Sequence, residues 1–296
     1  MTRLAASTVE LLVRQGLDVD DVLRVVTTAL EEDLRLGPDV TTLSTVGPDA
    51  RTTGAVVPRE AGVLAGLGVA VAVLDLVVGA DRELVHLGSD GDRAVPGESV
   101  LTVTARTAGL LTAERTMLNL MCHFSGVATA TDAWVQAVTG TPCRIRDTRK
   151  TLPGLRQLQK YAVRVGGGVN HRMALGDAAL IKDNHVVAAG GVVAAMRLVR
   201  AAAPGLHCEV EVDSLDQLDA VLAEGAELVL LDNFDVPTTA EAVRRRDAVA
   251  PGTGLESSGG LTLAVAGDYA RTGVDFVAVG ALTHSVTVLD LGLDLD

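Results

Sequence analysis

Aromatic residues are scarce in this sequence and make up 2% of its 296 residues. Alanine, valine, leucine and glycine are abundant, and 48% of the residues are hydrophobic. Because all-β domains draw heavily on aromatic side chains, this composition favours an α/β protein with buried strands rich in valine and leucine. The length suits either one α/β barrel or two smaller domains.

Cysteine is also sparse, and Cys122, Cys143 and Cys208 form neither a CxxC pair nor a metal-ligand pattern. Their spacing predicts reduced thiols. The N-terminus has no long apolar core of a signal peptide, and no stretch of about 18 uncharged apolar residues occurs. We therefore expect a soluble cytoplasmic protein that does not use a membrane.

Positive charge is in short supply, with a formal net charge of -13. An acidic surface repels nucleic acids and anionic membranes, so neither is expected as a partner. The segment 144–185 is the exception, since it holds all three lysines, Lys150, Lys160 and Lys182, and six arginines, Arg144, Arg146, Arg149, Arg156, Arg164 and Arg172. We interpret Lys160, Arg156 and Arg164 as the solvated face of a helix. The remaining cations predict a pocket for a small anionic molecule.

The first part of the chain predicts helices followed by short strands. A short helical or frayed leader runs to Leu17, and a helix follows over 18–36. Residues 52–103 form short valine-rich runs separated by glycines, with one helical run, which indicates a small α+β domain. Apolar spacing then predicts a helix over 110–138 with a break near Ser125 and Gly126.

Arg115 stands early in that last helix, where a cation opposes the helix dipole. Either a partner anion compensates it, or its cost is small and tolerated. The residues alone leave both explanations open.

Beyond Gly140 strands and helices alternate, which predicts parallel strands joined by helices, either doubly wound or closed into a barrel. The predicted strands are 144–147, 179–183, 209–213, 228–232, 254–257 and 276–280. The absence of a GxGxxG motif after the first strand disfavours a dinucleotide-binding sheet. We interpret the triplet Gly166–Gly168 as the end of a helix and a turn.

Polar residues gather where these strands end, which in barrels is the face that carries the active site. Ordinary polarity of strand-to-loop junctions explains one such end but not five of six. In the run EVEVD, alternation places Glu209, Glu211 and Asp213 on one side of a strand. Facing a barrel interior they require cations, for which Lys150, Lys182 and a divalent metal are candidates; an exposed edge strand is the alternative.

Asp232 ends another strand and has the same chemistry. Oxygen ligands of this type suit Mg²⁺ bridged to a phosphorylated substrate, and the sequence has no His/Cys cluster for zinc. Two late loops have the character of phosphate sites: Ser257–Gly260, which we expect to open a helix over 261–270, and Val279–Ala281.

These motifs resemble those of the quinolinate phosphoribosyltransferases, also called carboxylating nicotinate-nucleotide pyrophosphorylases. The matching runs in the second half are DTRKTLPGLRQLQKYAVRVGGGVNHR, LGDAALIKDNH, EVEVDSLDQL, LVLLDNF, LESSGGL and VGALTHS. The upstream runs EEDLRLGPDVTT and LLTAERTMLNLMCHFSGVAT resemble the family's amino-terminal domain and linking helix. The resemblance covers the chain from about Leu30 to Leu291, in the expected order.

The resemblance implies a type II phosphoribosyltransferase fold, an amino-terminal α/β open sandwich with an incomplete seven-stranded α/β barrel. The implied divisions are a leader and helix start at 1–29, the sandwich domain with its linking helix at 30–140, the barrel at 141–285 and a tail at 286–296 that returns toward the amino-terminal domain. It also implies a homodimer, or a larger assembly, in which Arg115 reaches the partner's site.

The implied reaction joins quinolinate to 5-phosphoribosyl-1-pyrophosphate with Mg²⁺, and yields nicotinate mononucleotide, pyrophosphate and CO₂ in NAD biosynthesis. Its implied catalytic residues are Lys150, Lys182, Glu211 and Asp232, of which Glu211 and Asp232 also bind the metal. Quinolinate would bind to Arg115, Arg149, His171, Arg172 and Lys182. The phosphoribosyl donor would bind to Thr148, Lys150, Glu211, Asp232, Ser258, Gly259, Gly260, Val279, Gly280, Ala281 and His284.

Three other functions compete with this one. A molybdenum-transport-associated paralogue shares the fold, but the full arginine set for two carboxylates disfavours it. A Schiff-base aldolase would use Lys182, although the surrounding arginines and phosphate loops suit it poorly. A catalytically silent phosphosugar-binding protein is the third. We interpret His86, His123, His185 and His207 as structural, and Asn184 and Asn233 as hydrogen-bonding residues at strand ends.

Overall fold

The computed structural model describes residues 4–296, so the first three residues of the expected leader lie outside it. The chain forms two compact units. The N-terminal unit contains residues 4–132, 151–166 and 282–296, and the barrel unit contains 133–150 and 167–281. The chain therefore passes between the units several times. The division implied by the resemblance instead separates the sandwich domain from the barrel at one boundary, near residue 140.

The N-terminal unit is built on a four-stranded antiparallel sheet in the order β12-β1-β5-β3. Its strands are β1 (Arg51–Pro58), β3 (Arg82–Leu87), β5 (Leu101–Arg106) and β12 (Leu291–Leu295), and β2 (Gly62–Val63) pairs separately with β4 (Arg93–Ala94). Strand β5 shows the alternation of buried and half-buried residues that one covered face requires. The last strand of the chain, β12, pairs with the first, with Val56 opposite Leu293.

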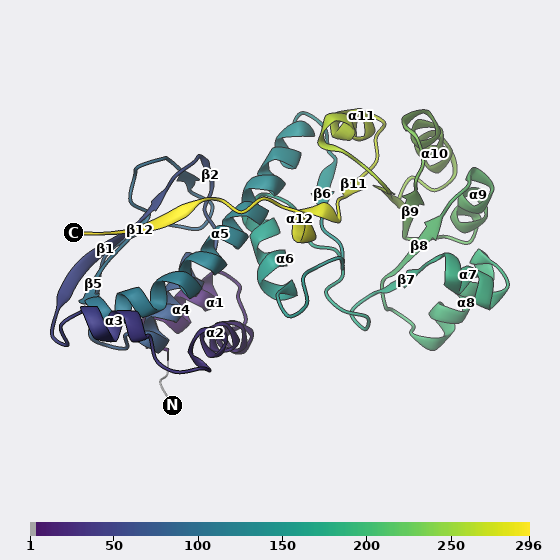
Figure 1. The fold of residues 1–296 in the computed structure, drawn as a ribbon. Helices are drawn as coiled ribbons and strands as arrows, with labels where there is room; N and C mark the ends of the chain where they lie inside the picture. The colour runs from purple at the N-terminus through teal and green to yellow at the C-terminus, as the bar shows by residue number, and fades with distance from the viewer. Residues whose placement is uncertain (1–3) are drawn as a thin grey trace. The chain divides into compact units, whose positions relative to one another are not determined.

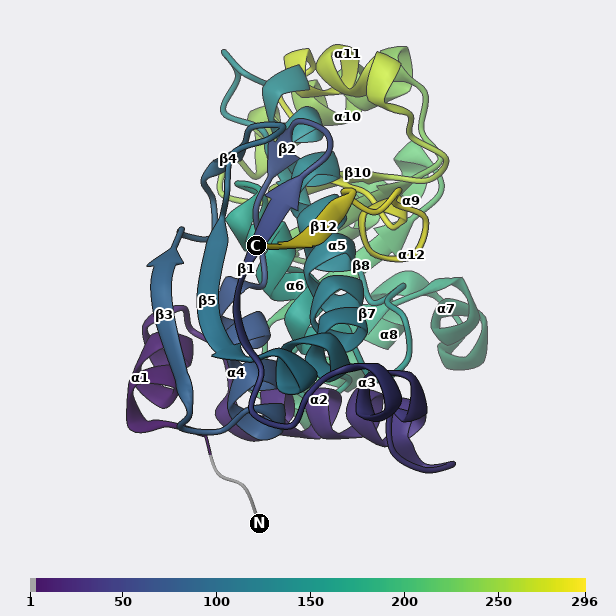
Figure 2. The same cartoon turned by 60° about the vertical axis from the view of Figure 1, so that its left-hand side comes forward.

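Helices cover one face of this sheet, as Figures 1 and 2 show for α4 and α5. The helices of this unit are α1 (Ala6–Arg14), α2 (Val19–Leu34), α3 (Val40–Thr45), α4 (Leu67–Val77), α6 (Arg156–Val165) and α5 (Thr107–Ala137), which continues into the barrel unit. Helix α4 is apolar except for Asp75, which pairs with Arg82, and it is nearly fully buried. The Asp90 carboxylate accepts hydrogen bonds from the first backbone N–H groups of α4, at Gly66 and Leu67, and from the Tyr161 hydroxyl.

The first two helices agree with the sequence prediction. Helix α1 buries Thr8 and Leu12, so this segment is packed rather than frayed. Asp18 caps α2 by accepting a hydrogen bond from the backbone N–H of Asp21.

The predicted break near Ser125 and Gly126 is wrong, since α5 is one helix of 31 residues. The Ser125 hydroxyl accepts a hydrogen bond from the Ala65 N–H and donates to the Ala65 carbonyl. A Cβ atom at Gly126 would lie 2.3 Å from the Thr287 carbonyl oxygen. These residues are therefore small because the chain packs closely against the helix, and not because the helix ends.

The barrel unit has six parallel strands in the order β6-β11-β10-β9-β8-β7. They are β6 (Arg144–Arg146), β7 (Ala179–Ile181), β8 (Cys208–Val212), β9 (Leu228–Asp232), β10 (Gly254–Ser258) and β11 (Phe276–Ala278), and they confirm the six predicted strands within two residues at each end. A single parallel bridge between Arg146 and Val169 stands beside β6 in place of a seventh strand. Because the first strand pairs with the last while β7 ends the sheet, the barrel is incomplete, as the resemblance implied.

The barrel helices lie outside the strands (Figure 1). They are α7 (Asp183–Ala189), α8 (Val192–Ala202), α9 (Leu215–Ala223), α10 (Val236–Val249), the 3₁₀ turn η1 (Leu263–Val265) and α11 (Ala266–Arg271), and a last turn, α12 (Ala281–His284), leads out of the unit. As expected, the triplet at Gly166 follows the end of a helix, α6.

The interpretation of Lys160 as part of a solvated basic face is wrong. Lys160 is fully buried, in a run of buried residues from Leu158 to Val163 in α6. Arg164 is exposed, and Arg156 is half-buried and donates a hydrogen bond to the Thr151 hydroxyl. The basic segment therefore has members with different roles.

Within residues 4–296 no single helix combines the length and hydropathy of a membrane span. The bent pair α7 and α8 reaches the threshold only when the two helices are taken together.

Candidate active site

A cavity of about 360 Å³ opens at the carboxyl ends of the barrel strands. We call it the carboxyl-end cavity, and its lining residues are Thr148, Arg149, Lys150, His171, Arg172, Leu180, Lys182, Glu211, Leu230, Asp232, Glu256, Ser258, Gly259 and Ala278. Ten of these are site residues predicted from the sequence. The structure thus brings together the polar strand ends on one face of the barrel unit.

Strand alternation explains how this lining arises. Ser258 and Asp232 end neighbouring strands and are register partners in β10 and β9. Two residues earlier on the same faces stand Glu256 and Leu230, which therefore lie one step deeper in the barrel. The cavity has a charged rim and a deeper layer that is mostly apolar, with Leu180, Leu230 and Ala278.

Lys182 and Glu211 form an ion pair on the rim, between Nζ and Oε2. Asp232 lies on the same rim, and burial, followed by the negative charge of Glu211, raises its pKa. The mutual repulsion of the Glu211 and Asp232 carboxylates favours the binding of a cation between them. Their oxygen atoms are the ligands that Mg²⁺ prefers. Glu211 and Asp232 therefore fit the predicted metal.

Asn233 links the ends of β9 and β10. Its backbone N–H donates to the Ser258 carbonyl at 2.9 Å, and its Nδ2 donates to Asp232 Oδ2 at 2.8 Å. Its φ of 56° lies in the left-handed region, which non-glycine residues seldom adopt. Gly259 has a φ of 103°, and a Cβ atom there would lie 2.2 Å from Asn233 Oδ1. This junction holds Asp232 and the backbone of the Ser258–Gly260 loop in a fixed relation.

Arg149 and Arg172 both line the cavity. Burial, followed by the positive charge of Arg149, lowers the pKa of the Arg172 guanidinium. Two guanidinium groups that line the same cavity suit an anionic ligand.

His171 has both ring nitrogens engaged. Its Nδ1 accepts a hydrogen bond of 2.6 Å from the backbone N–H of Arg172, and its Nε2 lies 2.8 Å from Glu209 Oε2. Because Nδ1 accepts, the ring presents Nε2–H to Glu209. The buried Asp147 carboxylate accepts the backbone N–H of His171 at 2.8 Å and the Asn170 amide at 2.6 Å, which fixes the segment below Arg172.

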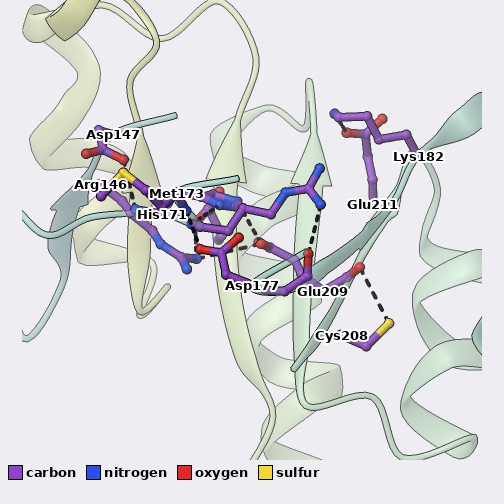
Figure 3. A network of polar contacts seen from close by, with 12 residues as sticks. Arg146, Asp147, His171, Met173, Asp177, Lys182, Cys208, Glu209 and Glu211 are labelled. Atoms are coloured by element: carbon purple, nitrogen blue, oxygen red, sulfur yellow. Dashed lines mark hydrogen bonds and ion pairs between the residues drawn. The ribbon is translucent and has the colours of Figure 1, made fainter. Parts of the chain in front are cut away.

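A charged layer lies deeper in the barrel, and we call Arg146, His171, Glu209 and Glu256 the buried polar layer. Arg146 Nη1 is 2.7 Å from Glu256 Oε2 and 3.7 Å from Glu209 Oε2. Figure 3 shows Arg146 and His171 directed toward Glu209, while Lys182 and Glu211 form a separate pair. Burial is the main cause that raises the pKa of both glutamates to about 7, and for Glu256 the charge of Glu209 adds to it.

His171, Glu209 and Glu256 have ligand atoms close enough together to hold a metal ion. The Arg146 guanidinium, however, already supplies a cation to Glu256, and the His171 Nε2 proton is directed at Glu209. A metal ion would have to displace both. The chemistry of this cluster therefore suits a buried ion-pair network, whereas Glu211 and Asp232 suit Mg²⁺.

Arg146 and Glu256 were not predicted as site residues. Lys150, Lys182 and a metal were expected to compensate the carboxylates of EVEVD, and Lys182 does pair with Glu211. Glu209, however, is contacted by Arg146 and His171. Asp213 follows the end of β8 and is exposed, so it does not face the barrel interior. Alternation in β10 was the signal for Glu256, because it lies on the same side as Ser258.

The helix expected over 261–270 begins two residues later, as the 3₁₀ turn η1 at Leu263, and continues directly as α11 to Arg271. The α-helical part has only six residues. A phosphate at this loop would depend on the loop's own backbone N–H groups, because the dipole of so short a helix is weak.

The other six predicted site residues lie within the described part of the chain but do not line the carboxyl-end cavity. Gly260 is exposed, Val279 is buried and donates its N–H to the Arg146 carbonyl, and Gly280 and Ala281 follow β11. Arg115 is exposed on α5, and His284 is exposed on α12; both belong to the N-terminal unit.

Three of the four histidines interpreted as structural, His123, His185 and His207, make ordinary polar contacts. His185 Nδ1 accepts the Lys182 backbone N–H at 2.9 Å, and His207 pairs with Glu227 on the surface. His123 Nε2 lies 2.8 Å from the Gln159 amide.

Two family models together cover most of the chain. Residues 39–125 match the N-terminal domain of quinolinate phosphoribosyl transferase, and residues 127–294 match its C-terminal domain. The chain belongs to the quinolinate phosphoribosyl transferase family. The resemblance in the sequence motifs is therefore confirmed.

Similar proteins support this family membership. The chain is 66% identical over 268 residues to the carboxylating nicotinate-nucleotide pyrophosphorylase of Mycobacterium leprae, covering 90% of this chain and 94% of that protein. The nicotinate-nucleotide pyrophosphorylase structure from Francisella tularensis matches with a TM-score of 0.88 and 37% identity, over 94% of this chain and 96% of the other. NadC from Streptococcus pyogenes matches with a TM-score of 0.89 and 36% identity, over 95% and 98%. These structures share the type II phosphoribosyltransferase fold expected for the chain.

Proposed function

We propose that the protein is a carboxylating nicotinate-nucleotide pyrophosphorylase that acts in NAD biosynthesis. It transfers the phosphoribosyl group of 5-phosphoribosyl-1-pyrophosphate to quinolinate and releases pyrophosphate and CO₂, leaving nicotinate mononucleotide. The observation that carries the proposal is the carboxyl-end cavity, where Arg149 and Arg172 meet Glu211 and Asp232. A dianionic acceptor and a cationic transition state require these two kinds of charge together.

Quinolinate has two adjacent carboxylates on a flat ring. The planar guanidinium groups of Arg149 and Arg172 match carboxylates in two-point hydrogen bonds, and Lys182 adds a compact charge on the rim. Fixed by Glu209 and by the Arg172 backbone, His171 presents a rigid wall beside the ring. The apolar residues Leu180 and Leu230 suit the face or edge of a pyridine ring.

Loss of pyrophosphate leaves positive charge on the ribose. Carboxylates held nearby stabilise that charge, which is the role we assign to Glu211 and Asp232. They would also hold Mg²⁺ or ribose hydroxyls, and bound Mg²⁺ would neutralise charge on the departing pyrophosphate. Lys150 and Thr148 would bind the pyrophosphate from the loop after β6.

The 5-phosphate would bind to the backbone of the two late loops, at Ser258–Gly260 and Val279–Ala281, with His284. Gly259 and Gly260 both have positive φ values, which lets their backbone N–H groups approach an anion closely. We further propose a homodimer in which Arg115 reaches the quinolinate site of the partner. The exposed position of Arg115 on α5 supports this assignment.

We place the protein in the cytoplasm, in agreement with three free cysteines, of which Cys143 and Cys208 are buried. The aldolase alternative needs Lys182 as a free nucleophile, but its Nζ atom is paired with the Glu211 carboxylate.

The first test is turnover of quinolinate and phosphoribosyl pyrophosphate with and without Mg²⁺, following nicotinate mononucleotide and CO₂, with nicotinate as a parallel acceptor. We expect product from quinolinate only, and only with Mg²⁺. Binding of the phosphoribosyl donor without product from quinolinate would contradict the function and favour the paralogue. If product forms equally well without Mg²⁺, the proposed function stands, but the assignment of Mg²⁺ is contradicted.

Arginine variants test quinolinate recognition. Arg149→Lys keeps the charge but loses the planar fork, so the KM for quinolinate should rise roughly 10-fold or more while the KM for the donor changes little. Arg144→Lys, at an exposed position on the same unit, is the matched control. An equal rise in both KM values would contradict the assignment.

A further inference from the structure

Glu256 is a fully buried carboxyl group at the floor of the carboxyl-end cavity. It stands on β10, one step deeper than Ser258, and β9 and β11 contribute the apolar side chains of Leu230 and Ala278 to the same floor. Its Oε2 atom accepts a hydrogen bond from Arg146, whereas its Oε1 atom has no hydrogen-bond partner among the residues described. An acidic group thus lies next to the space for a substrate with one oxygen uncommitted.

The charged groups around Glu256 come from five segments. Arg146 faces it from β6, Glu209 from β8, and His171 from the segment after Val169. The rim above adds the Lys182–Glu211 pair and Asp232. Burial and the negative charge of Glu209 raise the pKa of Glu256 to about 7, so near neutral pH a large fraction of this group keeps its proton.

The proposed reaction requires a proton at one defined position. When the carbon–carbon bond to the leaving carboxylate breaks, the electron pair stays on the ring carbon, and CO₂ departs. That pair lies in the plane of the ring, along the direction in which the carboxylate had pointed. A donor must therefore stand where the carboxylate was held, and it must be a stronger acid than an arginine.

We propose that the Glu256 carboxyl group donates the proton that replaces the departed carboxyl group on the pyridine ring. This inference rests on the proposed function. The C–CO₂ bond breaks, a C–H bond forms with the Glu256 proton, and Glu256 is left as a carboxylate paired with Arg146. The apolar floor assists, because loss of CO₂ from a carboxylate is faster in surroundings with little water.

Other proton donors in the cavity fit the geometry less well. The His171 proton is on Nε2 and directed at Glu209, and its Nδ1 accepts from the backbone, so neither nitrogen offers a proton to the cavity. Arg149 and Arg172 hold their protons too tightly. Lys182 is the remaining competitor, and its ammonium group is paired with Glu211 on the rim.

Glu256 must regain a proton after each turnover, and a second cavity supplies a route. It has a volume of about 300 Å³ at the amino ends of β7, β8 and β9, and its lining includes Arg146, His171, Cys208 and Glu209. The buried polar layer thus lies between this cavity and the carboxyl-end cavity. Water in the second cavity would reach the buried polar layer while substrate fills the carboxyl-end cavity.

The test separates the two chemical steps in Glu256→Gln, which keeps the shape of the side chain and an oxygen for Arg146. In a single turnover with quinolinate labelled in its 2-carboxyl group, pyrophosphate and labelled CO₂ are measured on the same samples. We expect pyrophosphate release within a few-fold of the unaltered protein, and CO₂ release slower by roughly 10²- to 10⁴-fold. CO₂ release by the unaltered protein should also slow as the pH rises through about 7, and this dependence should vanish in the variant.

Two results would overturn the proposal: CO₂ release that keeps pace with pyrophosphate and retains its pH dependence, or an equal loss of both steps, which indicates a structural role. Absence of both products from the unaltered protein would instead reject the proposed function. If the variant does not fold, proton uptake on quinolinate binding can be measured by calorimetry of the unaltered protein in buffers of different ionisation enthalpy. Binding of a dianion above Glu256 should take up protons near pH 8, and binding without uptake would overturn the proposal.

Discussion

His171 Nε2 lies 2.8 Å from Glu209 Oε2, and this contact fixes the imidazole ring of a cavity residue from beneath. The same ring accepts the Arg172 backbone N–H through Nδ1. Glu209 therefore acts on the quinolinate site through two intermediaries, the histidine ring and the backbone of Arg172. It is a positioning residue for both.

Replacement of Glu209 tests this arrangement. Glu209→Ala would leave the His171 Nε2–H without an acceptor in a buried place, and should lower the free energy of unfolding by roughly 1–3 kcal/mol. Glu209→Gln retains an accepting oxygen and should lose clearly less. Urea denaturation of both variants makes the comparison, and equal losses would show that the hydrogen bond to His171 is unimportant.

Gly259→Ala should damage donor binding. The new Cβ atom would collide with Asn233 Oδ1, and Asn233 in turn holds Asp232. We expect the KM for phosphoribosyl pyrophosphate to rise roughly 10-fold or more, since a displaced catalytic group is costly. Gly205→Ala is the control, because Gly205 also has a positive φ, would meet no atom within 4 Å and does not line the cavity. An equal rise in the Gly205 variant would contradict a role for the contact with Asn233.

Mixing two inactive variants tests the role of Arg115. If Arg115 serves the partner's site, a hybrid of Arg115→Ala and Lys150→Ala subunits has one site with both residues intact. A mixture that exchanges subunits freely should regain about a quarter of the normal activity, because about half of the dimers are hybrids with one active site. If Arg115 acts within its own subunit, no hybrid site is complete and activity stays absent.

Glu256 should make stability depend on pH. Its pKa is raised from 4.5 to about 7, so the folded protein holds this proton more tightly than the unfolded chain does. The resulting stabilisation is present below about pH 4.5 and is lost as the pH rises through about 7. Between about pH 5 and about pH 8, Glu256→Gln should therefore lose less stability than the unaltered protein, by a difference on the order of 2 kcal/mol. Glu83→Gln, at an exposed position, is the control, and its free energy of unfolding should change with pH as that of the unaltered protein does. The same change with pH in Glu256→Gln would contradict the raised pKa.

Much of the barrel was predictable because its strands are short apolar runs with polar ends. The strand Leu228–Asp232 has the predicted limits, and the residues that follow the strands do converge on one cavity. Here the local pattern and the tertiary structure point to the same answer, since parallel strands bring their carboxyl ends to one face.

The residues that were misjudged depend on partners distant in the sequence. Nothing local to Lys160 indicates that it is buried, and Gly126 resembles a helix break until the chain near Thr287 is seen against it. Glu256 is likewise paired with Arg146, which is 110 residues away. Charge and glycine patterns describe what a segment tolerates, but not which other segment approaches it.

The pairing of β12 with β1 closes the N-terminal sheet with a strand that follows the barrel in the sequence. The strand Leu291–Leu295 covers one edge of β1, and β1 precedes the barrel residues in the chain. Without that strand β1 has an unpaired edge, which is a place where chains aggregate. A variant that ends after Asp290 would contain every residue of the cavity and yet lack the strand that protects this edge.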